Sequence, residues 1–345
     1  MGMTDPRGSG TNRRTVLKGM AATTILGSSS VLGAGTASAA PSYHLAVVDQ
    51  NSRTVRVFDR NAKRWNDDAI IWTFEGKEYP WDHSWADLSD VKIRKTRARG
   101  LIALVVASGG AAGVVDIKKR GEHTDSRSDL IWAELPDDNP HSIERVPHNG
   151  SILTVSSQGD NNLQLYSPRN PDNIDDFDNY ERVRSWTFAG AHGIHWCPYG
   201  GRGLLWVLGD GKLVAYEVKG SGLNTDLDVY KTVPIKHAGP KMGHDLQPDY
   251  ANPGHLLVTD SQGVYRFHVD DEEIGAPEEN WAKKRVKSIA HHPSGEYVYV
   301  VGSKETGEMG THVSFADNEK LEVTDERGWS DARFYKARIF TPEYV

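Results

Sequence analysis

Short, largely apolar runs separated by turn residues fill the chain after residue 40. Examples are Leu45–Asp49, Leu101–Ala107 and Leu204–Leu208, and Gly, Asn or Asp residues lie between such runs. Runs of this length, some of them alternating between apolar and polar positions, predict β-strands, and turns such as Gly209-Asp210-Gly211 predict hairpins. No convincing helical spacing of apolar residues is present. The pattern therefore predicts an all-β domain.

A five-residue motif recurs six times, and its third position is always apolar. The copies are Ser89-Asp90-Val91-Lys92-Ile93, His141-Ser142-Ile143-Glu144-Arg145, His192-Gly193-Ile194-His195-Trp196, His244-Asp245-Leu246-Gln247-Pro248, Lys287-Ser288-Ile289-Ala290-His291 and Ser330-Asp331-Ala332-Arg333-Phe334. Their first residues are separated by 52, 51, 52, 43 and 43 positions. Repeats of this length, each able to supply four strands, are typical of β-propeller blades.

Six copies predict a six-bladed β-propeller in which the motif forms the innermost strand of each blade. The sixth copy lies too close to the C-terminus for a hairpin to follow it, so we expect the run from His44 to Phe74 to complete that blade. Closure from both ends leaves no open sheet edge. A seventh blade within Asp172–Tyr180 or Asp270–Trp281 is the alternative. A two-sheet sandwich is disfavoured because it does not need so regular a repeat.

Composition narrows the possible partners. The net charge is −7 and no run of Lys or Arg is present, so we expect neither nucleic acid nor an anionic membrane as a partner. The single cysteine, Cys197, excludes an intramolecular disulfide. The glycine-rich run at residues 109–113 is not followed by a predicted helix, so no nucleotide cofactor is expected. We expect a monomer.

The N-terminal segment has the three regions of an export signal. Asn12-Arg13-Arg14-Thr15-Val16-Leu17-Lys18 resembles the twin-arginine consensus, a weakly apolar stretch from Met20 to Leu32 follows, and Ala37-Ser38-Ala39 resembles a cleavage site. The apolar stretch is too short to be a membrane anchor. These features predict a signal peptide at residues 1–39, recognised by the twin-arginine translocase, and one secreted propeller domain at residues 40–345.

The motif predicts two rings of side chains around the propeller axis. The first positions, at the mouth, are Ser89, His141, His192, His244, Lys287 and Ser330, and the deeper fourth positions are Lys92, Glu144, His195, Gln247, Ala290 and Arg333. Three imidazoles on adjacent blades could bind one divalent ion (Mn, Ca or Zn), with Gln247 or water completing the shell. Direct action of these histidines on a substrate, or hydrogen bonding between blades, remain alternatives.

The lining charges favour an anionic ligand. Lys92, Lys287 and Arg333 face one carboxylate, Glu144, which predicts an acidic oligo- or polysaccharide as the partner. The alternative is that Glu144 pairs internally with Lys92 or an arginine of a neighbouring blade. We expect the second-position aspartates to pin turns between blades; they are Asp90, Asp245 and Asp331.

One lining carboxylate is too few for a two-carboxylate glycosidase, so a polysaccharide lyase is favoured over a hydrolase. In that hypothesis His195 is the base, and Lys92 and Arg333 neutralise the uronate carboxylate. The remaining lining residues would bind the substrate; they are Glu144, Lys287, Ser89 and Ser330.

Segments around the motif carry two resemblances. Gly190-Ala191-His192-Gly193, Gly243-His244-Asp245-Leu246-Gln247-Pro248-Asp249-Tyr250 and Arg333-Phe334-Tyr335-Lys336-Ala337-Arg338 resemble a family of secreted actinobacterial propellers of unknown function. That resemblance implies the fold and export but no activity. More remotely, His141, His192, His244 and Gln247 are similar to the metal-binding set of oligogalacturonate lyases.

Two other functions remain open. One is a non-catalytic propeller that binds a glycan or a protein. The other is a metal-dependent hydrolase, because residues 290–300 resemble the repeat of lactonase-type propellers.

Overall fold

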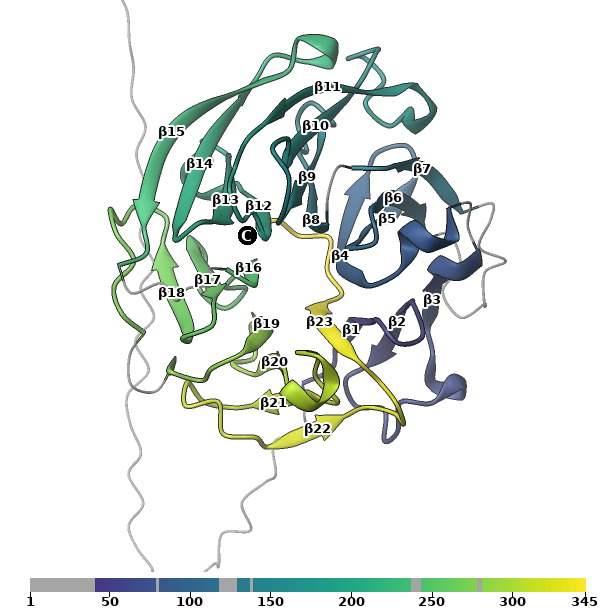
Figure 1. Cartoon of the computed structure of the whole chain (residues 1–345), viewed down its shortest axis with the longest axis vertical. Coiled ribbons are helices and arrows are strands. Elements are labelled where there is room, and N and C mark those ends of the chain that lie inside the picture. The colour runs from purple at the N-terminus through teal and green to yellow at the C-terminus, as the bar shows by residue number, and fades with distance from the viewer. Residues whose placement is uncertain (1–40, 79–80, 118–128, 137–138, 237–242, 278–280) are drawn as a thin grey trace, which may run out of the picture. The chain divides into compact units, whose positions relative to one another are not determined.

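The computed structural model describes residues 41–78, 81–117, 129–136, 139–236, 243–277 and 281–345. In this part the strands form six antiparallel sheets arranged as a six-bladed β-propeller (Figure 1). Residues 40–345 make up one compact unit. The predicted signal peptide and its cleavage site lie outside the described residues, so export stays a prediction. None of the described helices is long and apolar enough to span a membrane.

Each blade is numbered here from its innermost strand outward. The first blade contains β4 (Leu88–Thr96), β5 (Gly100–Ala107), β6 (Ala111–Asp116) and β7 (Leu130–Glu134). The second contains β8 (Pro140–Arg145), β9 (Ile152–Ser156), β10 (Leu163–Pro168) and β11 (Tyr180–Trp186). The third contains β12 (Gly193–Cys197), β13 (Leu204–Gly209), β14 (Lys212–Lys219) and β15 (Asp226–Pro234).

The other three blades follow the same scheme. The fourth has β16 (Asp245–Pro248), β17 (His255–Thr259) and β18 (Val264–His268). The fifth has β19 (Val286–His291), β20 (Tyr297–Val301), β21 (Val313–Ala316) and β22 (Asp325–Arg327). The sixth has β23 (Phe334–Ile339), β1 (His44–Asp49), β2 (Thr54–Asp59) and β3 (Trp72–Glu75).

The sixth blade is built from both ends of the propeller domain, as the sequence predicts. The strand β23 pairs antiparallel with β1, so the last innermost strand is completed by the first three strands of the domain. The two segments considered for a seventh blade form no sheet of their own among the described residues. Asp172–Tyr180 leads through a short 3-10 helix, η5 (Phe177–Asn179), into β11. The six-bladed prediction is confirmed.

The apolar third position of the motif packs between neighbouring blades. Val91, Ile143, Ile194, Leu246 and Ile289 are completely buried, and each belongs to a different apolar cluster. Burial of an aliphatic side chain contributes about 1.5–3 kcal/mol. The repeated apolar position therefore stabilises the contacts between successive blades.

The sixth copy of the motif was placed five residues too early. The innermost strand of the sixth blade begins at Phe334, so Ser330 and Arg333 precede it. Asp331 has a left-handed backbone (φ 62°), and the carboxylate of Asp49 accepts a hydrogen bond from the Arg333 amide at 2.8 Å, which holds this segment outside the strand. The motif of this blade is therefore Tyr335-Lys336-Ala337-Arg338-Ile339.

Candidate functional site

One end of the propeller axis opens into a pocket of about 890 Å³, which we call the mouth pocket. Its lining includes the first motif residues of five consecutive blades: His141, His192, His244, Lys287 and Tyr335. Arg333 also lines this pocket, although it precedes its strand. The structure therefore brings together five of the residues that the sequence places at or near the axis, and adds Tyr335.

Four innermost strands carry a β-bulge at the first motif position. The pairing register skips one residue in each; these residues are Ser89, His141, Lys287 and Tyr335. In three blades the residue two positions earlier has a positive φ: Asp87 (55°), Asn139 (62°) and Arg285 (61°). A bulged residue leaves the regular alternation of a strand, and its side chain takes a new direction. The bulge thus lets the first motif residue turn into the mouth pocket.

Ser89 is the exception among the bulged residues. Its side chain is completely buried, and its hydroxyl donates a hydrogen bond to the carbonyl oxygen of Pro140 on the neighbouring blade at 2.7 Å. The prediction that Ser89 contacts a substrate at the mouth is therefore wrong in this structure, because the bond between blades occupies the hydroxyl.

The mouth histidines are stacked against one another. The ring centroids of His141 and His192 lie 4.5 Å apart with an interplanar angle of 17°, and Tyr335 lies 5.9 Å from His141. The rings of His192 and His244 are 6.1 Å apart and nearly perpendicular. The Nδ1–H of His192 donates to the carbonyl oxygen of Gly190 at 2.7 Å, because a carbonyl can only accept. Its Nε2 is therefore the acceptor nitrogen of a neutral ring.

This arrangement does not fit the metal site that the sequence suggests. The lone pairs of an imidazole lie in the ring plane, so the nearly parallel rings of His141 and His192 do not direct them at one ion. Gln247 is buried away from the mouth, and its Nε2 donates to the carbonyl oxygen of Leu246 at 2.7 Å. In the described part of the chain, no three His, Cys, Asp or Glu side chains are grouped to hold a metal. Metal binding stays a prediction.

The mouth histidines are uncharged at neutral pH. Burial, assisted by the positive charges of Lys336 and Lys287, lowers the pKa of His192 to about 4. Burial and the neighbouring His192 hold the pKa of His141 well below its ordinary value. These rings can donate and accept hydrogen bonds. The positive charge of the mouth pocket therefore comes from its lysines and arginines.

Five cationic side chains but only two carboxylates line the mouth pocket. The cations are Arg53, Lys284, Arg285, Lys287 and Arg333, and the carboxylates are Asp87 and Glu308. The Nζ of Lys287 lies 4.0 Å from a carboxylate oxygen of Glu308. Lys284, Arg285 and Arg333 form no ion pair with any other described residue. An excess of unpaired positive charge in a concave site attracts anions.

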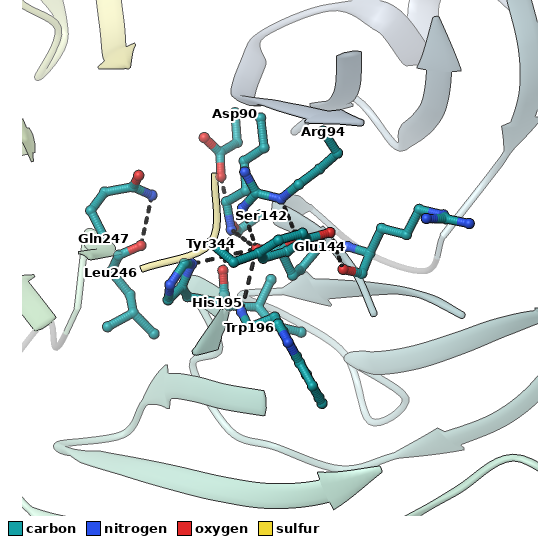
Figure 2. Close-up of polar contacts among 12 residues, drawn as sticks. Asp90, Arg94, Ser142, Glu144, His195, Trp196, Leu246, Gln247 and Tyr344 are labelled. Atoms are coloured by element: carbon teal, nitrogen blue, oxygen red, sulfur yellow. Dashed lines mark hydrogen bonds and ion pairs between the residues drawn. The ribbon is translucent and has the colours of Figure 1, made fainter. Parts of the chain in front are cut away.

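Below the mouth, the fourth motif positions form a buried ionic group, which Figure 2 shows. Glu144 accepts hydrogen bonds from Arg94 at 2.8 and 2.6 Å, and its Oε2 lies 3.6 Å from the Nζ of Lys92 and 3.5 Å from the Nδ1 of His195. Every one of these side chains is at least 97% buried. The internal pairing that was the alternative for Glu144 is thus observed.

This burial changes the roles that the sequence suggested. His195 and Lys92 are remote from the mouth pocket lining, so in this structure neither reaches a ligand there, and the catalytic residues proposed for a lyase are not assembled with Arg333. Burial lowers the pKa of Lys92 to about 8 despite the attraction of Glu144. Burial also lowers the pKa of His195, and Glu144 only partly opposes this.

Two aspartates and two basic residues complete what we call the axial cluster. Arg338 donates to Asp90 at 3.0 and 2.8 Å and to Asp245 at 2.6 Å through two nitrogens. The Nζ of Lys336 lies 3.7 Å from Asp90 and 3.4 Å from Asp245. Burial alone would raise the pKa of Asp90, but Arg338 and Lys336 lower it to about 2. These aspartates bind charges across the axis, so the expectation that they pin turns was wrong.

The segment after β23 covers the deep end of the axial cluster. In Figure 1 the C-terminal residue lies inside the ring of innermost strands. The guanidinium of Arg94 lies 4.3 Å from the ring centre of Tyr344, whose hydroxyl donates to the carbonyl oxygen of Arg145 at 2.7 Å. The Nε2 of His195 is 3.5 Å from the main-chain oxygen of Val345. His195 is therefore enclosed from this side as well.

Comparison with known proteins finds the fold and no family. No family model matches the sequence, and no curated protein matches it. Among solved structures, the chain is similar to a functionally unknown protein from Desulfotomaculum acetoxidans DSM 771, with a TM-score of 0.49, 10% identity, and coverage of 86% of this chain and 80% of that chain. It is also similar to a chain of a nidogen/laminin complex, with a TM-score of 0.50, 14% identity, and coverage of 88% and 100%.

The likeness to the nidogen/laminin chain, at 14% identity, shows a shared fold and nothing about function. The resemblances to secreted actinobacterial propellers and to oligogalacturonate lyases stay predictions.

Proposed function

We propose that this propeller binds an acidic saccharide in its mouth pocket. The observation that carries the proposal is the group of unpaired cations, Lys284, Arg285 and Arg333, around a pocket of a chain whose net charge is −7. Carboxylate or sulfate groups of a sugar would pair with these cations. The other class of ligand group, the hydroxyl, suits the neutral imidazoles of the pocket, which can both donate and accept.

The proposal includes an extracellular location. The twin-arginine-like segment around Arg13 and Arg14 would bring the folded domain to glycans outside the cell. Replacing both arginines by lysine should abolish appearance of the protein in the culture medium while leaving the cytoplasmic pool intact. Unchanged secretion of that variant would contradict export by this route.

A lyase reaction at the mouth is a second candidate, favoured by the fixed tautomer of His192. Its Nε2 could take the C5 proton of a uronate while Arg285 or Arg333 pairs with the carboxylate. The C4–O bond would then break as the C4=C5 bond forms, and the leaving oxygen would take a proton. A base whose pKa is about 4 is weak at neutral pH, however, so binding is better supported than turnover.

Calorimetric titration with uronate, sulfated and neutral oligosaccharides tests the binding proposal. The variant R285A/R333A should bind the acidic ligand about ten-fold more weakly, because two charge-assisted contacts are lost. R97A is the matched control, since Arg97 is an exposed arginine directly after β4, at the end away from the mouth. Equal affinity for neutral and acidic sugars, or an unchanged R285A/R333A, would refute the proposal.

The same samples test turnover. The C4=C5 bond of a lyase product absorbs in the ultraviolet, so wild type and H192A are compared after incubation with uronate polymers. New absorbance that disappears in H192A would establish the lyase, and absence of new absorbance across the panel would leave binding alone.

A further inference from the structure

Two further hollows continue outward from the mouth pocket. The mouth pocket shares Asn51, Thr306 and Arg333 with a hollow of about 800 Å³. That hollow in turn shares His312 and Gly328 with a third hollow of about 370 Å³. Shared lining residues show that the three adjoin in series. We call this series the seam groove, because its walls come from the fifth and sixth blades.

The walls of the seam groove come from segments far apart in the sequence. Asn51 lies in the β1–β2 turn and Lys63–Asn66 follows β2, both in the sixth blade. His312 immediately precedes β21 and Gly328 immediately follows β22, both in the fifth blade. The groove therefore runs between two blades, from the axis to the outer strands.

The middle of the seam groove is polar. The second hollow is lined by Thr311, Ser330 and Asp331 and by the half-buried indole of Trp329. Ser330, which the sequence placed at the axis as a substrate-binding residue, lies here instead. Hydroxyl and carboxylate groups next to an aromatic ring suit a ligand with many hydroxyl groups.

The outer end of the seam groove is basic again. Lys63, Arg64 and Arg327 line the third hollow, with one carboxylate, Glu326. Arg327 is committed to Asp325 and to the carbonyl oxygen of Ala62. Lys63 and Arg64 are exposed, and within the described chain they form no ion pair. Unpaired cations therefore stand at both ends of a polar middle section.

We infer that the seam groove binds an extended acidic polysaccharide, which runs from the mouth pocket to the outer cations Lys63 and Arg64. This inference rests on the proposed function and extends it from a small saccharide to a polymer. A ligand that reaches both cationic ends needs repeated negative charges, and the polar section between them needs hydroxyl groups. An acidic polysaccharide has both. A polyanion is repelled by most of a chain with net charge −7, so local cations decide its path.

An acidic peptide is the competing ligand, and it is less well matched. Peptides that bind along a propeller seam use main-chain hydrogen bonds to a strand edge or apolar pockets for side chains. The second hollow instead presents mostly hydroxyl, amide and charged groups. The peptide is kept as an outcome of the test.

The test measures affinity against ligand length for a disaccharide, a tetrasaccharide, a hexasaccharide and a decasaccharide of one acidic repeat. Wild type should bind the decasaccharide at least about ten-fold more tightly than the disaccharide. The variant K63A/R64A should lose most of this gain while binding the disaccharide normally. Its affinity for the decasaccharide should also depend less on salt, by a slope of about one per lost contact. R97A serves as the charge-matched control.

The outcomes separate this inference from the proposed function. Equal affinity for the disaccharide and the decasaccharide, or an equal loss for both in K63A/R64A, overturns the seam groove and leaves mouth binding intact. Failure of every acidic saccharide to bind overturns both. A glutamate-rich peptide of equal charge that binds as tightly as the decasaccharide overturns the assignment to a saccharide. Circular dichroism of K63A/R64A verifies that the variant is folded.

Discussion

Replacing Arg338 by methionine is the most direct test of what holds the centre of the ring together. Its guanidinium donates to Asp90 on β4 and to Asp245 on β16, so one side chain of the sixth blade binds the first and the fourth blades. The side chain is only 4% exposed. Methionine retains much of the volume and removes the charge, which leaves two buried carboxylates with a single strong partner, Lys336.

The expected loss of stability follows from that geometry. Removing one partner of a buried ion pair costs about 3–5 kcal/mol, because the other charge remains without compensation. Lys336 offsets part of this for both aspartates, so we expect the lower end, about 3 kcal/mol. For a domain of this size that corresponds to a fall in Tm of roughly 5–10 °C. The double variant R338M/D90N should regain part of the loss, because Asp245 then pairs with Lys336 alone.

Guanidinium unfolding followed by the fluorescence of the ten tryptophans measures these changes, with calorimetry to verify that unfolding is cooperative. R333M is the control, since Arg333 is exposed and its replacement should change the free energy of unfolding by no more than about 0.5 kcal/mol. If R338M lies within about 1 kcal/mol of wild type, the buried charges are not compensated as argued here. If R338M/D90N is no better than R338M, lost packing rather than unpaired charge is the cause.

Three other predictions concern pH, the C-terminal segment and metals. Because the pKa of His192 is about 4 when folded and near 6.5 when unfolded, the unfolded chain binds the extra proton between these pH values, and stability falls by about 1.4 kcal/mol per pH unit on acidification; thermal melts from pH 7 to pH 4 should show a flatter dependence in H192Q. Removing the hydroxyl of Tyr344 leaves the carbonyl of Arg145 without its donor, so Y344F should lose about 1 kcal/mol in guanidinium unfolding, and a change below the error of the measurement would contradict the contact. Since the mouth imidazoles do not converge, a chelator should leave Tm unchanged; one equivalent of metal that disappears in H141A/H192A/H244A would instead re-establish the metal site.

Much of the fold is predictable because the packing constraint repeats. An apolar residue that must lie between two blades recurs at one position in every innermost strand, and Val91 and Ile143 show it as clearly in the sequence as in the structure. Closure by the N-terminal strands follows from the missing hairpin after the last copy. The last copy itself was misplaced because two overlapping segments have a small apolar third residue, Ala332 and Ala337. Only the contact of Asp49 with Arg333, made by residues far apart in sequence, decides between them.

The candidate site is predictable only where it follows the repeat. Equivalent positions in adjacent blades place His141, His192 and His244 together, and the structure does the same. How far the axis stays open is not encoded in the repeat. The bulges are invisible to a simple alternation, and the axis is filled by residues outside the motif, such as Arg94 and Tyr344.

The seam groove is further still from prediction. Its cations belong to loops with no common pattern, and only the fold brings them to one seam.

Burial divides the charges of this propeller into two groups with different roles. In the axial cluster four cations, Lys92, Arg94, Lys336 and Arg338, meet three carboxylates, and such charges must be paired because unpaired charges cannot be buried. At the mouth, Arg285 and Arg333 can stay unpaired because water still reaches them. A paired buried charge stabilises and an unpaired accessible charge binds. R338M should therefore change unfolding but not the saccharide affinity of the folded protein, and R285A/R333A should do the reverse; the same effect of both variants in either assay would contradict this division.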